Sequence, residues 1–162
     1  MTVPQPYPQA PELDVAQWFN TERPLTLAGL RGRVVVLHAF QMLCPGCVRA
    51  GLPQAQKIAT FFPPGEVAVI GLHTVFEHHA AMTPVSLAAF IHEYRLTFPI
   101  AVDRPGESGP IPRTMAAYGL RGTPSLVLID RDGLVRRHVF GAEEDIKVGA
   151  EIALLMAEGQ AQ

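Results

Sequence analysis

The stretch AFQMLCPGCVRAGLPQ (39–54) contains the only two cysteines of this 162-residue chain. Pro45 and Gly46 separate Cys44 from Cys47. The same spacing occurs in metal sites, in structural disulfides and in pairs that exchange disulfides, so the surrounding sequence must decide among them. A structural disulfide is the least favoured, because a disulfide stabilises a protein more when it closes a longer loop, and this loop is very short.

The residues around the pair predict a strand followed by a helix. Residues 33–40, RVVVLHAF, form a continuous apolar run rich in β-branched residues, which is typical of a strand buried on both faces. A helix is expected to begin near Cys44, because the proline that follows would then lie in the first turn, where a missing N–H costs nothing. The helix is expected to run towards Phe62, with a kink or turn near Gly51 and Pro53.

A Cys-x-x-Cys pair between a buried strand and a helix start favours redox chemistry over metal binding. A thiolate at a helix N-terminus faces the positive end of the helix dipole and unpaired N–H groups, which lower a cysteine pKa from ~8.5 into a range of roughly 3.5–7.5. Cys44 is therefore the candidate nucleophile, and Cys47 is the candidate that resolves the mixed disulfide. Pro45 and Gly46 are expected to tune the redox poise and to contact the substrate.

Further along the chain, strands and helices are expected to alternate. The expected elements are a short hairpin or edge element in 13–33, strands at 65–73 and 98–103, helices at 83–96, 113–120 and 142–159, and a hairpin at 125–141 that turns at Asp132 and Gly133. Parallel strand–helix–strand units followed by an antiparallel hairpin predict an α/β fold: a three-layer sandwich with a mixed central sheet and helices on both faces.

The composition indicates one globular domain. Hydrophobic residues make up 48% of the chain, which is enough for a core, and the formal net charge is only −2. A Pro-rich arm (1–11) is expected to precede a single domain (12–162) without joining its core. The absence of a basic patch argues against nucleic acid as a partner, and no apolar run approaches the roughly 20 residues that span a membrane.

The N-terminal sequence bears on location. MTVPQPYPQAPELD (1–14) has neither the basic start nor the apolar segment of a secretory signal, so a cytoplasmic protein is expected. Thiols are mostly kept reduced in that compartment. No Gly-rich nucleotide loop is present either, so we expect no organic cofactor.

A second segment carries a candidate site residue pair. GLRGTPSLVLID (119–130) places Thr123 and Pro124 at the entry to a predicted strand. A proline there is expected at the strand start as an ordinary trans residue or, alternatively, in a cis peptide bond. A cis bond would turn backbone groups outward beside Cys44, where an extended substrate chain could pair with them.

Together these segments resemble a known family. LAGLRGRVVVLHAFQMLCPGC, VAVIGLHT, FPIAVD and YGLRGTPSLVLIDRDGLVRRHVFG are similar to the TlpA-like, redoxin-type thiol–disulfide oxidoreductases of the thioredoxin superfamily, over roughly residues 12 to 158. The resemblance implies a thioredoxin-like fold, with Cys44 attacking, Cys47 resolving and Thr123–Pro124 as the facing cis-proline element. It also implies a disulfide-containing protein or small molecule as substrate and a reducing partner such as thioredoxin or glutathione.

The sequence departs from that family pattern at three positions. Leu43 replaces the tryptophan that usually precedes the first cysteine, and His38 stands where thioredoxins have a buried acid. Pro53 follows the second cysteine by six residues rather than five, so a local bulge in the helix is expected. His38 is a candidate for exchanging a proton with Cys47; the alternative is a buried neutral histidine satisfied by a hydrogen bond.

Two other functions are considered. Peroxidases of the peroxiredoxin type resemble one another in a Pro-x-x-x-Thr/Ser-x-x-Cys motif. When the motif is aligned on Cys44, its Pro and Thr/Ser positions hold Leu37 and Gln41, and alignment on Cys47 is no better. A metal carrier or sensor would combine the two cysteines with the segment HTVFEHH, which supplies His73, Glu77, His78 and His79. The simpler interpretation of that segment is a polar loop after a strand, and no resident metal is expected.

Overall fold

A six-stranded mixed sheet forms the centre of the protein in the computed structural model, which describes residues 6–158. In sheet order the strands are β1 (Val15–Phe19), β4 (Ile100–Asp103), β3 (Val67–His73), β2 (Val34–Phe40), β5 (Ser125–Ile129) and β6 (Val135–Phe140). Strands β2, β3 and β4 run parallel, whereas β1, β5 and β6 are antiparallel to their neighbours. The predicted mixed sheet is therefore confirmed.

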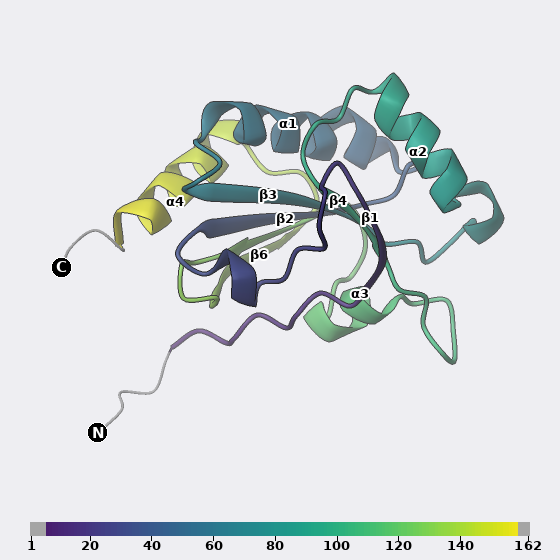
Figure 1. The fold of residues 1–162 in the computed structure, drawn as a ribbon, viewed down its shortest axis with the longest axis horizontal. Helices are drawn as coiled ribbons and strands as arrows, with labels where there is room; N and C mark the ends of the chain where they lie inside the picture. The colour runs from purple at the N-terminus through teal and green to yellow at the C-terminus, as the bar shows by residue number, and fades with distance from the viewer. Residues whose placement is uncertain (1–5, 159–162) are drawn as a thin grey trace.

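Helices cover both faces of this sheet (Figure 1). Helices α1 (Leu52–Phe61), α2 (Pro84–Glu93) and α4 (Asp145–Glu158) pack on one face. Helix α3 (Arg113–Tyr118) lies on the other, together with the N-terminal segment and the 3₁₀ turn η1 (Ala28–Leu30). Two apolar clusters fill the two interfaces, which confirms the predicted three-layer sandwich.

Strand β2 separates the two cores. All seven of its residues are buried, as the continuous apolar run predicted. Because side chains alternate along a strand, Val34, Val36 and Phe40 pack in the cluster beneath α1 and α4, while Val35 and Leu37 pack in the opposite cluster. The chain therefore leaves β2 from the middle of the molecule, at the edge of the sheet where the parallel strand β3 also ends.

The local end signals of two helices are confirmed. The Thr83 side chain accepts a hydrogen bond from the Ser86 backbone N–H and caps α2. Helix α2 ends at Glu93, earlier than the sequence predicts, and the chain turns through a left-handed conformation at Arg95. Gly119, with φ of 61°, ends α3 as expected.

The N-terminal region confirms one of the two predicted alternatives. Within 13–33, residues Val15–Phe19 form an edge strand, β1, which pairs antiparallel with β4 far along the chain, and no local hairpin forms there. Residues 1–5 of the predicted arm lie outside the described part of the chain. Residues 6–9 are exposed, but Ala10 is buried in the core, and its N–H donates to the Gly133 carbonyl at 2.9 Å. The pairing of this segment with the β5–β6 turn satisfies backbone groups of both. The sequence alone does not reveal this pairing.

Candidate active site

The two cysteines lie together where β2 meets the first long helix. A turn closed by the Cys44 N–H and the Gln41 carbonyl, at 3.2 Å, connects β2 to the helical segment. Cys44 and Cys47 form a disulfide with a Cα–Cα distance of 5.2 Å. Cys44 is half-buried, whereas Cys47 is fully buried. Only Cys44 therefore presents sulfur to an incoming molecule.

Two backbone N–H groups of the helix start contact Cys44, one at its sulfur and one at its carbonyl. The Cys47 N–H points at Sγ of Cys44 at 3.2 Å, and the Val48 N–H donates to the Cys44 carbonyl at 3.1 Å. Unpaired N–H groups at the start of a helix favour negative charge nearby. The N–H at the helix start is thus directed at the outer sulfur, that of Cys44, while Cys47 lies one turn inside the protein.

The helix after the cysteines contains the expected bulge. Residues Cys47–Gly51 are π-helical (η2), and α1 begins at Leu52. A π-helical turn accommodates one extra residue, which matches the one-residue displacement of Pro53 from the family pattern. At Gly51 a Cβ atom would lie 3.2 Å from Cβ of Pro124, so glycine lets the bulged turn approach the Pro124 segment closely.

Thr123 and Pro124 lie directly beside the disulfide. Sγ of Cys44 is 3.5 Å from the Thr123 carbonyl oxygen, and the Thr123–Pro124 peptide bond is cis. Gly46 packs on the same proline, since a Cβ there would lie 3.2 Å from its Cδ. Pro124 is buried and Thr123 half-exposed. The structure thus brings these sequence-predicted site residues together, with the exposed Pro45 at the rim.

His38 lies behind this group, buried on β2. Its Nε2 is 3.3 Å from Oε1 of Gln54, and its Nδ1 is buried with no hydrogen-bond partner among the described residues. Burial lowers the pKa of His38 to about 4, so the imidazole is neutral at physiological pH. A Cβ on Gly51 would lie 3.6 Å from Nδ1, which places the histidine directly under the bulged helix.

The orientation of Gln54 defines the proton arrangement on His38. The Gln54 amide nitrogen donates to the Glu143 carbonyl at 2.8 Å and to the Asp145 carboxylate at 3.0 Å. Its oxygen therefore faces His38 and can only accept, so Nε2 of the neutral imidazole carries the hydrogen and Nδ1 is left as an acceptor. Sequence reasoning missed Gln54, although a glutamine at a buried helix position is an available signal.

The histidine-rich segment does not form a metal site. His73 is buried, and its Nε2 accepts a hydrogen bond from the Met42 N–H at 3.4 Å. Burial lowers the pKa of His73 to about 4. Glu77, His78 and His79 are exposed on the loop beyond β3. Within residues 6–158 no three His, Cys, Asp or Glu side chains converge as metal ligands, so this structure does not support the metal carrier hypothesis.

Gln41 is a buried residue of the site that sequence reasoning did not select. Gln41 is 1% exposed, and its side chain contacts two other segments of the chain. Oε1 accepts from the Phe76 N–H at 3.2 Å, and Nε2 lies 3.4 Å from Oε1 of Glu77 and 3.5 Å from Oγ1 of Thr123. The available signal is a polar residue between an apolar strand and the first cysteine.

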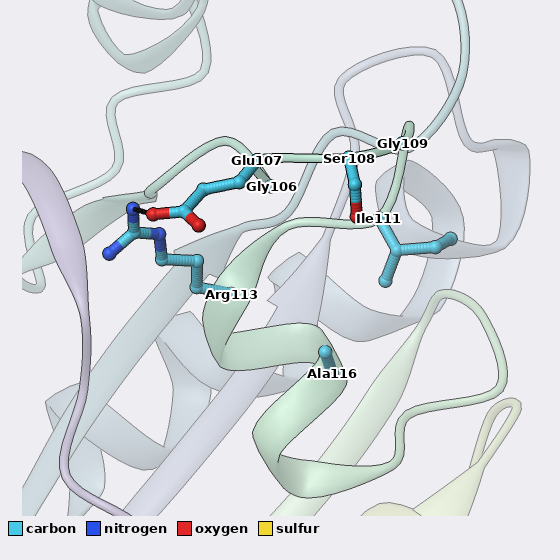
Figure 2. Close-up of a pocket in the computed structure, with 7 residues that line it drawn as sticks. All are labelled: Gly106, Glu107, Ser108, Gly109, Ile111, Arg113 and Ala116. Atoms are coloured by element: carbon cyan, nitrogen blue, oxygen red, sulfur yellow. Dashed lines mark hydrogen bonds and ion pairs between the residues drawn. The ribbon is translucent and has the colours of Figure 1, made fainter.

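A cavity of about 600 Å³ lies apart from the disulfide. Figure 2 shows its lining, in which the Glu107 carboxylate and the Arg113 guanidinium form an ion pair at 2.7 Å. The lining comes from the loop 106–111 and from α3, and neither cysteine contributes to it. The volume of this cavity therefore does not identify the reactive site.

None of the helices described in residues 6–158 is long and apolar enough to cross a membrane.

Comparisons with known proteins agree with this geometry. Residues 7–138 match the AhpC/TSA family. The crystal structure of a thioredoxin-like superfamily protein is 62% identical, covers 91% of this chain and 96% of that one, and superposes with a TM-score of 0.89. A thiol-disulfide isomerase from Corynebacterium glutamicum is 50% identical, with coverage of 93% and 97% and a TM-score of 0.89. These neighbours confirm the thioredoxin-like fold.

A curated relative is much longer than this chain. Protein DipZ from Mycobacterium tuberculosis is 32% identical over 135 residues, which are 82% of this chain and 18% of DipZ. The chain therefore spans less than a fifth of the length of that relative.

Proposed function

The chain belongs to the AhpC/TSA family, and we propose that it is a thiol–disulfide oxidoreductase that works through Cys44 and Cys47. The observation that carries the proposal is the disulfide itself, which joins a half-buried sulfur at a helix start to a fully buried one beside Thr123–Pro124. The printed name of the 50% identical isomerase supports the same reaction class.

The proposed reaction begins with the reduced protein. The Cys44 thiolate attacks one sulfur of a substrate disulfide, which forms a mixed disulfide and releases the other substrate sulfur as a thiolate. Cys47 then loses its proton and attacks Sγ of Cys44. This step releases the second substrate thiolate and leaves the Cys44–Cys47 disulfide present in the structure. An external dithiol or thiol, of the thioredoxin or glutathione class, returns the two electrons.

Thr123 and Pro124 are proposed as the cis-proline element that contacts the substrate, together with Pro45 and Gly46. The support is proximity: the Thr123 carbonyl is 3.5 Å from the attacking sulfur. In residues 6–158, no hydrogen bond involves the Thr123 N–H, so that donor is available to an extended chain laid beside it. The proposed substrate is a disulfide-containing protein or small molecule, and only an extended chain can use that backbone donor.

His38 is proposed as the group that takes the proton of Cys47 during the second step. Its acceptor Nδ1 lies under the π-helical turn that begins with Cys47, and burial keeps the ring neutral. A neutral imidazole accepts a proton and does not donate one from this nitrogen. The test is His38→Gln: resolution of a pre-formed mixed disulfide should slow, while its formation by Cys44 keeps the wild-type rate.

A peroxidase activity is the competing function within this family. Peroxiredoxin-like chemistry needs a hydroxyl three residues before the reactive cysteine, and Gln41 occupies that position with its side chain engaged by Phe76, Glu77 and Thr123. No observation favours it over disulfide exchange. The cytoplasmic location stays a prediction from the N-terminal sequence, to be tested by localising the full-length protein in its native cell.

Free thiols counted over time in the reduced, metal-free protein test the proposed function. Parallel reactions contain hydrogen peroxide or a small disulfide. We expect both thiols to disappear rapidly with the disulfide and slowly with peroxide. If peroxide reacts faster by orders of magnitude, the oxidoreductase proposal is wrong and Cys44 is a peroxidatic cysteine.

A further inference from the structure

The Gln41 carboxamide is held in one orientation by its surroundings. Its oxygen accepts the Phe76 N–H at 3.2 Å, the shortest of its side-chain hydrogen bonds. The amide nitrogen must therefore face the two remaining neighbours, the Glu77 carboxylate at 3.4 Å and the Thr123 hydroxyl at 3.5 Å. Both neighbours have lone pairs that accept the two amide hydrogens, so the orientation satisfies every polar atom of this buried side chain.

The Thr123 hydroxyl acquires a direction from this contact. An amide nitrogen only donates, so Oγ1 of Thr123 acts as the acceptor and its own hydrogen is directed away from Gln41. Thr123 is half-exposed, and its carbonyl lies 3.5 Å from Sγ of Cys44. The hydroxyl hydrogen is thus left for a group other than Gln41, on a residue whose carbonyl lies beside Cys44.

We propose that Gln41 is a positioning residue that makes the site selective for disulfides within extended polypeptides. By holding Thr123 and the Phe76–Glu77 loop, it presents the Thr123 hydroxyl as a fixed donor to a carbonyl oxygen of a chain that crosses Cys44. A small disulfide without carbonyl groups, such as bis(2-hydroxyethyl) disulfide, cannot use this donor in that way. The inference rests on the proposed function, because it concerns the substrate of the same exchange reaction.

Gln41 is itself buried and lies in the chain between two buried apolar residues, Phe40 and Met42. An unbranched apolar side chain of similar length would fill the same space, whereas a glutamine must be desolvated and then satisfied. The three contacts of Gln41 all lead to segments at the rim of the site, which is where substrate recognition takes place.

The experiment compares two substrates and a matched control. Gln41→Met keeps the approximate volume and removes the donors. On a disulfide-linked extended peptide we expect kcat/KM to fall by about 10-fold, mostly through KM, as for one lost hydrogen bond in a desolvated site. On bis(2-hydroxyethyl) disulfide we expect a change of less than about 2-fold. Gln56→Met is the control, because Gln56 also bridges a threonine, Thr97, but far from the cysteines.

A double-mutant cycle with Thr123→Val separates positioning from a general effect on folding. If Gln41 acts through the Thr123 hydroxyl, the double variant loses no more peptide activity than the larger of the two single variants. Should Gln41→Met fail to fold, Thr123→Val alone carries the test, because the inference requires it to lose more activity on the peptide than on bis(2-hydroxyethyl) disulfide.

Equal losses on both substrates, additive losses in the cycle, or wild-type activity of Gln41→Met on the peptide would each overturn the inference. Failure of the proposed function gives a different result, since the wild-type protein would then reduce neither substrate.

Discussion

Two segments at the same end of the sheet, one after β2 and one at the end of β3, contain candidate site residues. In the structure, the residues of one segment lie together and those of the other do not. The segment after β2 holds Cys44 and Cys47, whose Cα atoms lie 5.2 Å apart next to Thr123. The segment at the end of β3 holds four candidate ligands, but His73 faces the core and the other three are exposed on the loop. The cysteine segment therefore lies against a distant part of the chain, whereas the four candidate ligands of the other segment lie apart from one another.

The difference follows from where each segment sits in its secondary structure. Residues three apart at the start of a helix lie on one face, so a Cys-x-x-Cys spacing brings both sulfurs together without help from other elements. The histidines instead span the end of a strand and the loop beyond it, where His78 adopts a left-handed conformation that turns the chain. Spacing predicts convergence within one regular element, and it does not do so across an element boundary.

The largest effect on activity should come from replacing Cys44, in the segment whose residues lie together. Cys44→Ser removes the proposed nucleophile, so we expect disulfide reduction to fall by roughly 10³-fold or more. His79→Ala, on the dispersed segment, is the matched control and should keep wild-type turnover. Substantial activity in Cys44→Ser, measured by the rate of substrate thiol release, would show that the two segments have been assigned the wrong roles.

The two buried histidines should make folding stability depend on pH. Burial lowers the pKa of His38 and of His73 from 6.5 to about 4. Between these values the unfolded chain binds more protons than the folded one, so the free energy of unfolding falls as pH falls. This stability is fully present above about pH 6.5 and is lost towards pH 4, by up to about 3 kcal/mol for each histidine.

Urea unfolding at a series of pH values measures this dependence. His73→Gln keeps an acceptor for the Met42 N–H and removes one titrating group, so the slope against pH should decrease by about one proton. His92→Gln, on the exposed end of α2, should leave the slope unchanged. A wild-type stability that is flat between pH 6.5 and 4 would contradict the burial of both rings.

A smaller effect is expected at Gly51, where the helix meets the Pro124 segment. Gly51→Val places branched carbons against Pro124 and His38, so we expect a loss of about 1–3 kcal/mol in the free energy of unfolding. Gly149→Ala in α4 meets no atom within 4 Å and should stabilise the protein by about 0.5–1 kcal/mol. Thermal or urea melts of the two variants should move in opposite directions, and a stabilised Gly51→Val would argue against this close packing.

The smallest effect concerns metal binding. Because His78 and His79 are exposed and do not converge with the cysteines, His78→Ala and His79→Ala should leave the zinc affinity of the reduced protein unchanged. Isothermal titration with zinc measures this directly. A 10-fold weaker affinity in either variant would revive the metal hypothesis for the segment.

Much of the fold was predictable because its signals are local. The apolar run of β2, the Thr83 cap, the Gly119 helix end and the displaced Pro53 each report on their own neighbourhood, and each is confirmed. The pairing of β1 with β4 and the burial of Ala10 depend on partners about 85 to 125 residues away, and no local pattern encodes them.

The candidate site divides in the same way. The cysteine pair was predicted from its spacing. Thr123–Pro124 was predicted from the family resemblance, because no local sequence pattern indicates that a proline 80 residues away lies beside Cys44. Gln41 and Gln54 were missed because a carboxamide gains its role from the groups around it. Their signal, a polar residue at a buried position, identifies a constraint without naming its partners.

The most direct test of the account is to trap the mixed disulfide. Reduced Cys47→Ser protein is mixed with a disulfide-linked peptide, and the products are analysed by mass spectrometry without reductant. We predict a stable adduct of one peptide half on Cys44, because the half-buried sulfur attacks and nothing then resolves the bond. No adduct, or an equally fast adduct on Cys47 in the Cys44→Ser protein, would contradict the proposed order of attack.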